Sequence, residues 1–294
     1  MSLKRASAVA ASAVLLGGVA TVTTTAVPAG AAAAAACTMS VGSITSGGDL
    51  GTTNITASSP VTAKQSTGVH LFTPGIAKAS SQWTTAYEPT GSITSGNVIL
   101  NDTLYAAYYS DEPGLPPTGL SRTASGMGNF TVYENSYHVG ATHWGNYGLR
   151  NDGVLYRWTN NSFVTVNRYP GFAAVKTMTL ISQTNAYDTF LANTRGGALS
   201  TIRIPANTAL KPIVTKIRAS TWQTFESLVA ERCGTQSTLL TAIDKDTGTA
   251  YLYAVGHANG AATVIKGLGK VPGTYKDPIY YRRTVAGNPA LNGG

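Results

Sequence analysis

The chain has 294 residues, of which 43% are hydrophobic and only 12% are charged, and its formal net charge at pH 7 is +8. Lysine and arginine are scattered rather than clustered, and no recognisable nucleic-acid-binding module is present, which argues against a nucleic-acid partner. Abundant glycine, threonine, serine, asparagine and tyrosine are typical of an extracellular all-β protein.

The first part of the chain, residues 1–36, has the features of a secretory signal peptide. Lys4 and Arg5 precede an apolar run over residues 8–22, and Ala29-Gly30-Ala31 is a good signal-peptidase site. The run is too short and too rich in alanine to favour a membrane span, and no later segment is long enough. We therefore expect a mature, secreted protein of residues 37–294 without a membrane span.

Cys37 and Cys233 are the only cysteines, and in an oxidising compartment we expect them to form a disulfide. The bond would close a loop of nearly two hundred residues, for which the chain-entropy model gives a stabilisation on the order of 5 kcal/mol. Two alternatives remain open, namely two buried free thiols and lipidation of Cys37. The three residues before Cys37, residues 34–36, are all alanine and lack the larger aliphatic side chain that lipidation normally requires three positions before the cysteine.

Five turns containing Gly or Asp, each followed by an aromatic or aliphatic strand, occur in order along the chain. They lie at residues 68–72, 101–105, 151–156, 197–199 and 246–251. Apolar runs precede several of them, so that a run, a turn and a second run predict a hairpin. Further strands are expected at residues 130–133, 175–181, 225–230 and 279–281, and no convincing helical period follows the leader.

An internal repeat organises these elements. Residues 172–204 recur about fifty residues later as residues 222–255, with Phe172 aligned to Trp222. A repeat of roughly this size, built from short apolar runs and Gly-centred turns, is typical of propeller blades. The sequence therefore predicts an all-β fold, a single β-propeller domain over residues 37–294 with five blades of four-stranded antiparallel sheets.

No linear motif predicts catalysis, a metal or a cofactor. There is no Gly-x-Ser-x-Gly nucleophile motif, and the four histidines lie in no metal-ligand spacing. Asp244, Asp246 and Gly248 form only part of a calcium loop. Carboxylates from separate blades can still meet in space, so an enzyme remains an alternative.

The strongest candidate for ligand binding is Trp144. Carbohydrate recognition needs a flat apolar ring with hydrogen-bonding groups beside it, and residues 143–152 concentrate such groups in a turn-rich segment. Trp144 has no counterpart in the repeat, whereas Trp222 matches Phe172 and so reads as structural. The candidate binding residues are Trp144, His143, Tyr147, Arg150, Asp152 and, secondarily, Trp83. The alternative for each is packing between blades.

Residues 151–158, with the sequence NDGVLYRW, precede Gly171-Phe172 and Trp222 at the starts of corresponding strands. This pattern resembles the tachylectin-type five-bladed β-propeller lectins, mainly over residues 145–285. Their blades carry a similar turn-Leu-Tyr signature and bind N-acetylated sugars, so the resemblance implies a propeller lectin.

These observations together predict a secreted, non-catalytic binding module that recognises an extracellular glycan or cell-wall polymer. Two alternatives from other classes stay open. One is a propeller hydrolase or lyase that acts on an extracellular polysaccharide, which clustered carboxylates at the channel mouth would favour. The other is a cell-surface platform for a protein partner, which a broad apolar face would favour.

Overall fold

The computed structural model describes residues 36–137, 144–159 and 164–294. Residues 36–294 form one compact unit, and each regular element within the described ranges is a β-strand. The prediction of an all-β fold is therefore confirmed. The predicted signal peptide lies outside the described residues except for its last position, Ala36.

Three sheets contain four antiparallel strands each, in sequence order from one edge to the other. The first has β8 (Phe130–Ser136), β9 (Gly145–Arg150), β10 (Leu155–Thr159) and β11 (Val164–Tyr169). The second has β12 (Val175–Gln183), β13 (Tyr187–Thr194), β14 (Leu199–Pro205) and β15 (Ile213–Arg218). The third has β16 (Ser227–Cys233), β17 (Ser237–Asp244), β18 (Thr249–Val255) and β19 (Ile265–Val271). These sheets confirm the predicted four-stranded antiparallel unit.

The remaining strands form one eight-stranded sheet with the order β3-β2-β1-β20-β4-β5-β6-β7. Its strands are β1 (Thr38–Ile44), β2 (Asp49–Thr56), β3 (Thr62–His70), β4 (Ala77–Tyr87), β5 (Ser92–Leu100), β6 (Thr103–Ser110), β7 (Thr118–Ser125) and β20 (Ile279–Val285). It consists of two antiparallel four-stranded groups, because β20 is antiparallel to β1 but parallel to β4. The last strand therefore pairs with the first.

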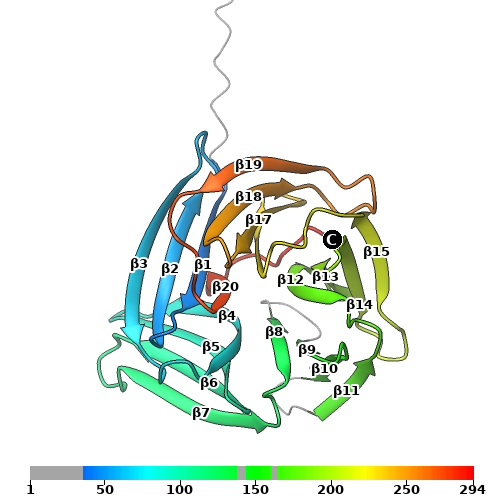
Figure 1. Cartoon of the computed structure of the whole chain (residues 1–294). Coiled ribbons are helices and arrows are strands. Elements are labelled where there is room, and N and C mark those ends of the chain that lie inside the picture. The colour runs from blue at the N-terminus through cyan, green and yellow to red at the C-terminus, as the bar shows by residue number, and fades with distance from the viewer. Residues whose placement is uncertain (1–35, 138–143, 160–163) are drawn as a thin grey trace, which may run out of the picture. The chain divides into compact units, whose positions relative to one another are not determined.

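The strands are arranged radially, which is the architecture of a β-propeller (Figure 1). The strands β4, β8, β12, β16 and β20 lie innermost and contact one another in that order, and β20 also pairs with β4. The strands β3, β7, β11, β15 and β19 lie at the outer edge.

One hydrogen bond recurs between successive four-stranded groups. A buried residue that leads into one group donates its backbone N–H to the carbonyl oxygen of a hairpin turn in the group before it, at N···O distances of 2.9–3.1 Å. The donor and acceptor pairs are Phe72 and Gly48, Met127 and Asp102, Phe172 and Gly153, Trp222 and Gly197, and Tyr275 and Gly248. Trp222 and Phe172 thus hold equivalent structural positions, as the repeat predicted.

The first hairpin turn differs from the prediction. Gly68 was expected to lie in a turn, but it lies inside β3, while the turn of the first group is formed by residues 45–48. Gly48 has φ +89°, which a side chain rarely adopts. The sequence Gly-x-x-Leu-Phe at residues 68–72 suggested a hairpin turn followed by a strand. The prediction was wrong because Leu71 and Phe72 lead into the next group and do not follow a hairpin turn.

The core consists of apolar clusters, each placed between two successive groups. One contains Leu149 and Leu155 from the sheet of β8–β11 together with Phe190 and Ile202 from the sheet of β12–β15. A second cluster lies between the sheet of β12–β15 and that of β16–β19, and a third lies between β16–β19 and the group of β1–β3. A fourth lies between the group of β1–β3 with β20 and that of β4–β7, and a fifth lies between β4–β7 and β8–β11. Alternate residues of each strand point to opposite faces, so every sheet buries both faces against its neighbours.

Candidate functional site

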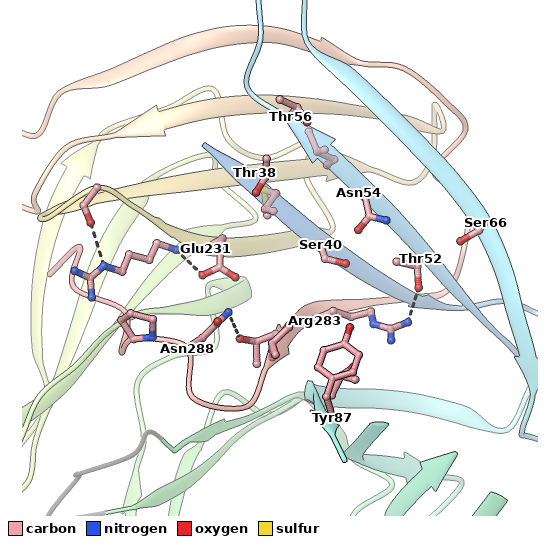
Figure 2. A pocket seen from close by; sticks show the side chains of 18 residues that line it. Thr38, Ser40, Thr52, Asn54, Thr56, Ser66, Tyr87, Glu231, Arg283 and Asn288 are labelled. Carbon is pink, nitrogen blue, oxygen red and sulfur yellow. Dashed lines mark hydrogen bonds between the residues drawn. The ribbon is translucent and has the colours of Figure 1, made fainter. Parts of the chain in front are cut away.

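A cavity of about 790 Å³, which we call the Tyr87 pocket, lies where β1, β2 and β20 approach the end of β16. Its lining is mostly hydroxyl, amide and charged side chains, and Figure 2 shows them converging on the cavity from separate strands. The polar lining includes Ser40, Thr52, Asn54, Thr56, Ser66, Thr85, Glu231, Arg232, Arg283 and Asn288. Such a set can donate to and accept from a polyhydroxylated ligand.

Tyr87 is the aromatic side chain of this pocket. It ends β4, where the backbone turns back so that Glu88 N–H donates to the Gly91 carbonyl oxygen at 2.9 Å. Its side chain is 72% exposed. A large aromatic ring left in solvent beside hydrogen-bonding groups can stack on the apolar face of a ligand.

Arg283 fixes one polar wall of the Tyr87 pocket. One terminal nitrogen donates to Thr52 Oγ1 at 2.5 Å and the other to the Tyr109 hydroxyl at 2.6 Å. On the opposite side, Asn288 Nδ2 donates to Thr284 Oγ1 at 2.9 Å. These bonds hold donors and acceptors in place before a ligand arrives, which lowers the entropy cost of binding.

Three innermost strands are connected by Arg282. Its Nε and one terminal nitrogen donate to the two carboxylate oxygens of Glu231, at 2.9 and 2.8 Å, and the other terminal nitrogen donates to Gln82 Oε1 at 3.0 Å. A bidentate guanidinium and carboxylate pair of this kind is both strong and directional. It fixes the Glu231 carboxylate, which lines the Tyr87 pocket.

Glu134 of β8 lies near the same arginine. Burial raises the pKa of its carboxyl from the ordinary 4.5 to about 8, and the positive charge of Arg282 opposes part of that rise. The carboxyl is therefore protonated at neutral pH. A carboxylic acid on β8 and an ion-paired carboxylate on β16 thus both interact with Arg282.

A second cavity of about 600 Å³, the Tyr137 pocket, lies between β5–β7 and the end of β8. Tyr108, Gly119, Leu120 and Tyr137 contribute to its lining, and the last two side chains are about half exposed. Gly119 faces the ring of Tyr108 at a distance too short for any side chain there, since a Cβ at this position would lie 2.0 Å from Tyr108 Cε1. The absence of a side chain at Gly119 therefore makes room for the Tyr108 ring beside the pocket.

A third cavity adjoins both pockets. This smaller cavity of about 110 Å³ shares Gln82, Thr84 and Tyr137 with the Tyr137 pocket and shares residues 284–285 and 288–289 with the Tyr87 pocket. We call the three cavities together the channel-mouth groove. Its length across several strands suits an extended ligand better than a single small molecule.

Trp144, the main predicted binding residue, lies beside this groove. Its ring packs edge-on against Tyr137, with 4.9 Å between ring centroids, and the two side chains are 43% and 48% exposed. Trp144 is thus an exposed aromatic residue, and its described neighbour lines the groove.

Tyr147 and Trp83, also predicted to bind ligand, lie in the core. Tyr147 is 0% exposed and donates its hydroxyl hydrogen to Asp188 Oδ2 at 2.6 Å; burial and the nearby Asp188 charge raise its pKa well above the ordinary range. Trp83 is 1% exposed and packs against Tyr109 and Tyr281. Both side chains are therefore buried among neighbouring residues instead of exposed to a ligand.

The other predicted residues do not join Trp144. Arg150 forms an ion pair with Asp152 at 3.0 Å and donates to the Tyr156 hydroxyl at 2.9 Å, at the far end of β9. His143 lies outside the described residues. The segment of residues 143–152 was expected to be turn-rich, but residues 145–150 within it form the strand β9. The extended backbone carries Trp144 and Arg150 away from each other.

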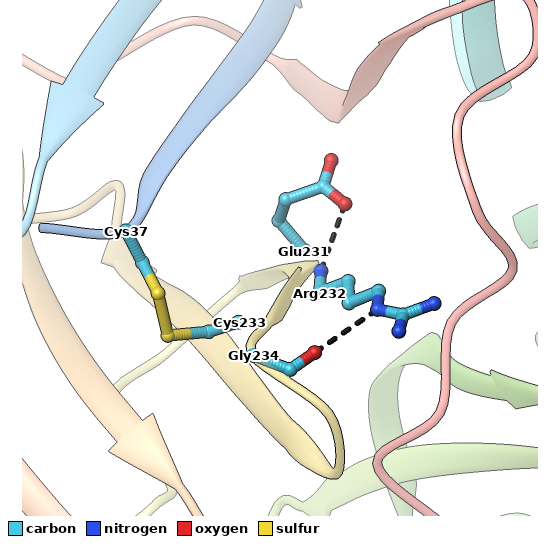
Figure 3. The surroundings of a disulfide bond; sticks show 5 residues. All are labelled: Cys37, Glu231, Arg232, Cys233 and Gly234. Carbon is cyan, nitrogen blue, oxygen red and sulfur yellow. Dashed lines mark hydrogen bonds between the residues drawn. A yellow bond between two sulfur atoms is a disulfide. The ribbon is translucent and has the colours of Figure 1, made fainter. Parts of the chain in front are cut away.

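The predicted disulfide between Cys37 and Cys233 is present, with a Cα–Cα distance of 5.6 Å. Figure 3 shows it at the end of β16, close in sequence to Glu231 and Arg232 of the Tyr87 pocket. It connects the segment before β1 to β16 and so fixes one side of the pocket.

Two further observations concern metals and membranes. In the ranges that the structure describes, no group of three or more His, Cys, Asp and Glu side chains could hold a metal ion. The same ranges include no helix that is long and apolar enough to cross a membrane.

Comparison with known proteins gives weak similarities. No protein-family model and no curated protein matches the chain. The solved structures that match include a GH62 α-L-arabinofuranosidase catalytic domain from Coprinopsis cinerea, with 12% identity, TM-score 0.41, and 72% of this chain and 74% of that chain covered. Another is the α-L-arabinofuranosidase PaAbf62A from Podospora anserina in complex with cellotriose, with 9% identity and TM-score 0.44. The match covers 74% of this chain and 80% of that chain. A third is a GH43_1 enzyme from Xanthomonas citri, with 10% identity and TM-score 0.37, and the match covers 64% of this chain and 74% of that chain.

Similarities at this level assign neither a family nor an activity. The resemblance to tachylectin-type lectins is not tested by them and stays a prediction. What can be said of function rests on the geometry of the site.

Sequence reasoning missed Tyr87, Tyr137 and Arg283. Each stands at or near the end of an innermost strand, and no local motif marks these positions. They become neighbours of one groove only because distant strands converge in the ring. One sequence pattern could have identified these three residues. Each is an aromatic or charged residue at a position where the alternation of apolar and polar residues along a strand ends.

Proposed function

We propose that residues 37–294 form a five-bladed β-propeller in which β20, β1, β2 and β3 make up one blade. Support comes from the recurrence of one turn hydrogen bond in each of the five groups, from the apolar clusters between successive groups, and from the pairing of β20 with both β1 and β4. A C-terminal strand that completes the blade of the N-terminal strands closes such a ring.

We propose that this propeller is an extracellular carbohydrate-binding protein and that the channel-mouth groove holds the glycan. The observation that carries the proposal is the pair of exposed aromatic positions, Tyr87 in one pocket and Tyr137 with Trp144 at the other, with fixed polar groups in the groove. Sugar rings stack on such side chains while their hydroxyls bond to the polar lining.

Secretion belongs to the same proposal. Residues 1–36 would act as the signal peptide, and the Cys37–Cys233 disulfide fits an oxidising compartment. The partner would then be a glycan or polymer outside the cell. The length of the groove favours an extended chain of several sugar units over a free monosaccharide.

The test is a binding screen of the protein, purified with its disulfide intact, against a glycan array and insoluble cell-wall polysaccharides. We expect retention by one class of polymer, and we expect Tyr87→Ala and Trp144→Ala each to reduce it about tenfold or more because each removes a stacking surface. Tyr251→Ala is the matched control, since Tyr251 is 37% exposed on β18 and lines none of the groove cavities. Equal retention of all variants would contradict the assignment of the groove.

A second function, hydrolysis of an extracellular polysaccharide, is favoured by one observation. Glycoside hydrolysis requires a protonated carboxyl as acid and a second carboxylate as base or nucleophile. Arg282 lies near both Glu134, whose pKa is about 8, and its ion-pair partner Glu231. Release of reducing ends from the polysaccharide that binds best, abolished in both Glu134→Gln and Glu231→Gln, would establish an enzyme. Binding without any product would leave the non-catalytic function.

A further inference from the structure

A separate cavity of about 300 Å³ lies between the end of β7 and the sheet of β8–β11. Its lining is Ala124, Ser125, Gly126, Met127, Phe130, Arg150, Tyr156, Trp158, Thr165 and Arg168, and none of these residues lines the channel-mouth groove. The cavity is thus a different place on the molecule, with two arginines beside an aromatic wall. We call it the Arg168 cavity.

The aromatic wall of the Arg168 cavity is fixed by its own packing. The rings of Tyr156 and Trp158 stack with centroids 5.5 Å apart and an interplanar angle of 23°. Phe130 meets Tyr156 edge-on at 5.2 Å. All three side chains belong to the apolar cluster between the sheets of β4–β7 and β8–β11, so the wall is preformed.

Both arginines approach the ring of Tyr156, but only one is neutralised. The guanidinium carbon of Arg150 is 5.6 Å from the ring centroid, and Arg150 also bonds to the Tyr156 hydroxyl and pairs with Asp152. The guanidinium carbon of Arg168 is 5.2 Å from the same centroid. Among the described residues Arg168 has no hydrogen-bond or ion-pair partner, and the cavity lining contains no carboxylate.

The N–H donors of Arg168 have no partner among the described residues. The N–H groups of a guanidinium form a planar fork. Those N–H groups match the two oxygens of a carboxylate or of a phosphate ester. Because the negative charge of Asp152 compensates that of Arg150, Arg168 carries the one uncompensated charge of the cavity lining. The cavity is therefore positively charged and favours an anion.

We propose that the Arg168 cavity binds one acidic monosaccharide unit. Its oxyanion, a carboxylate or a phosphate ester, pairs with Arg168, and its C–H face packs against the wall of Phe130, Tyr156 and Trp158. The cavity volume lies at the lower end of ligand pockets, which fits one sugar ring rather than an extended chain. This site is independent of glycan binding in the channel-mouth groove.

The test is calorimetric titration of the disulfide-intact protein at low ionic strength with glucuronate, glucose 6-phosphate, glucose and inorganic phosphate. We expect binding of the two sugar acids, weaker binding at higher salt and none of glucose, because the charge pairing is partly exposed and screened. Arg168→Gln should weaken sugar-acid binding about tenfold or more, and Arg168→Lys should restore only part of it because lysine lacks the planar fork.

The matched control is Arg203→Gln. Arg203 also lies over a tyrosine ring, that of Tyr187, at 4.2 Å, but it does not line the Arg168 cavity. Arg203→Gln and Tyr87→Ala should both leave sugar-acid binding unchanged, so failure of the groove assignment and failure of this one are distinguishable.

Three results would overturn the proposal. They are absence of binding of both sugar acids at millimolar concentration, equal loss in Arg168→Gln and Arg203→Gln, and binding of inorganic phosphate as tightly as the sugar acids. The last result would show an anion site without the aromatic contribution. Both arginine variants should keep the thermal midpoint of the wild type, since each residue is at least partly exposed.

Discussion

At the scale of single residues, Arg282 holds the centre of the molecule together. It lies on β20 and bonds to Glu231 on β16 and to Gln82 on β4, so that one guanidinium joins three innermost strands. Both members of the ion pair are largely shielded, with side chains 9% and 13% exposed. A charge in such a place is costly to leave without its partner.

Replacing Arg282 by Met should therefore lower the free energy of unfolding by about 3 kcal/mol, since the Glu231 carboxylate loses its compensating charge. Urea unfolding measures the loss. The double variant Arg282→Met with Glu231→Leu is the control and should recover most of it, because no unpaired charge remains. Equal destabilisation in the single and double variants would show that packing, and not charge, makes Arg282 necessary.

The raised pKa of Glu134 makes the stability of the folded protein depend on pH. Its pKa is about 8 in the folded protein, against 4.5 ordinarily. Between these values the folded state keeps a proton that the unfolded state has lost, so the contribution of Glu134 to stability falls as pH rises. Between about pH 5 and pH 8, we expect the thermal midpoint of Glu134→Gln to fall less than that of the wild type. A wild type and a variant with parallel pH profiles would contradict the raised pKa.

At the scale of the elements, the hairpin turns do more than reverse the chain. Gly153 has φ +80°, and a Cβ placed there would lie 2.2 Å from the backbone nitrogen of Ala173, at the entry to the next sheet. The absence of a side chain lets the turn contact that entry segment. Gly171 also has a positive φ, +103°, but its Cβ would meet nothing within 4 Å.

These two glycines allow a paired test. Gly153→Ala and Gly171→Ala carry the same kind of backbone strain, on the order of 1 kcal/mol, but only the first adds a clash with backbone. We expect Gly153→Ala to be the more destabilising by about 2 kcal/mol or more, measured by chemical unfolding. Similar losses would mean that the contact between turn and entry segment adjusts freely.

Much of the element-scale organisation could be predicted from the sequence. The hairpins around Gly153, Gly197 and Gly248 were readable because a positive-φ residue stands between two apolar runs. The strand β9 was not readable as a strand, since Gly145, Gly148 and Asn146 suggest a turn. Its glycines serve packing, because a Cβ at Gly148 would lie 2.6 Å from the ring of Phe130.

The candidate site was less predictable. Trp144 could be singled out because the repeat does not explain it, and the structure places it in solvent beside Tyr137. Tyr87 and Arg283 are about two hundred residues apart along the chain and line the same pocket. Proximity of that kind follows from the ring and not from local pattern, so a single sequence could not supply it.

At the scale of the whole molecule, the disulfide joins parts of the chain 196 residues apart. Chain entropy gives its stabilisation as on the order of 5 kcal/mol, because the unfolded chain loses the freedom of a very large loop. The double variant Cys37→Ser, Cys233→Ser should therefore unfold at lower urea concentration than the oxidised wild type. Reducing agent should destabilise the wild type and leave the double variant unaffected. If the wild type is equally stable with and without reductant, the bond does not contribute to stability.

The position of β20 has a kinetic consequence. Its pairing with β1 brings together residues such as Ile44 and Ile279, which are separated by most of the described chain. Contacts of this kind raise the contact order and slow folding, because a long loop must be closed before the pairing contributes free energy. Until β20 arrives, β1 and β4 each present an unpaired edge to solvent, and such edges invite pairing with another chain. During synthesis this protein stays vulnerable to aggregation until β20 has been made.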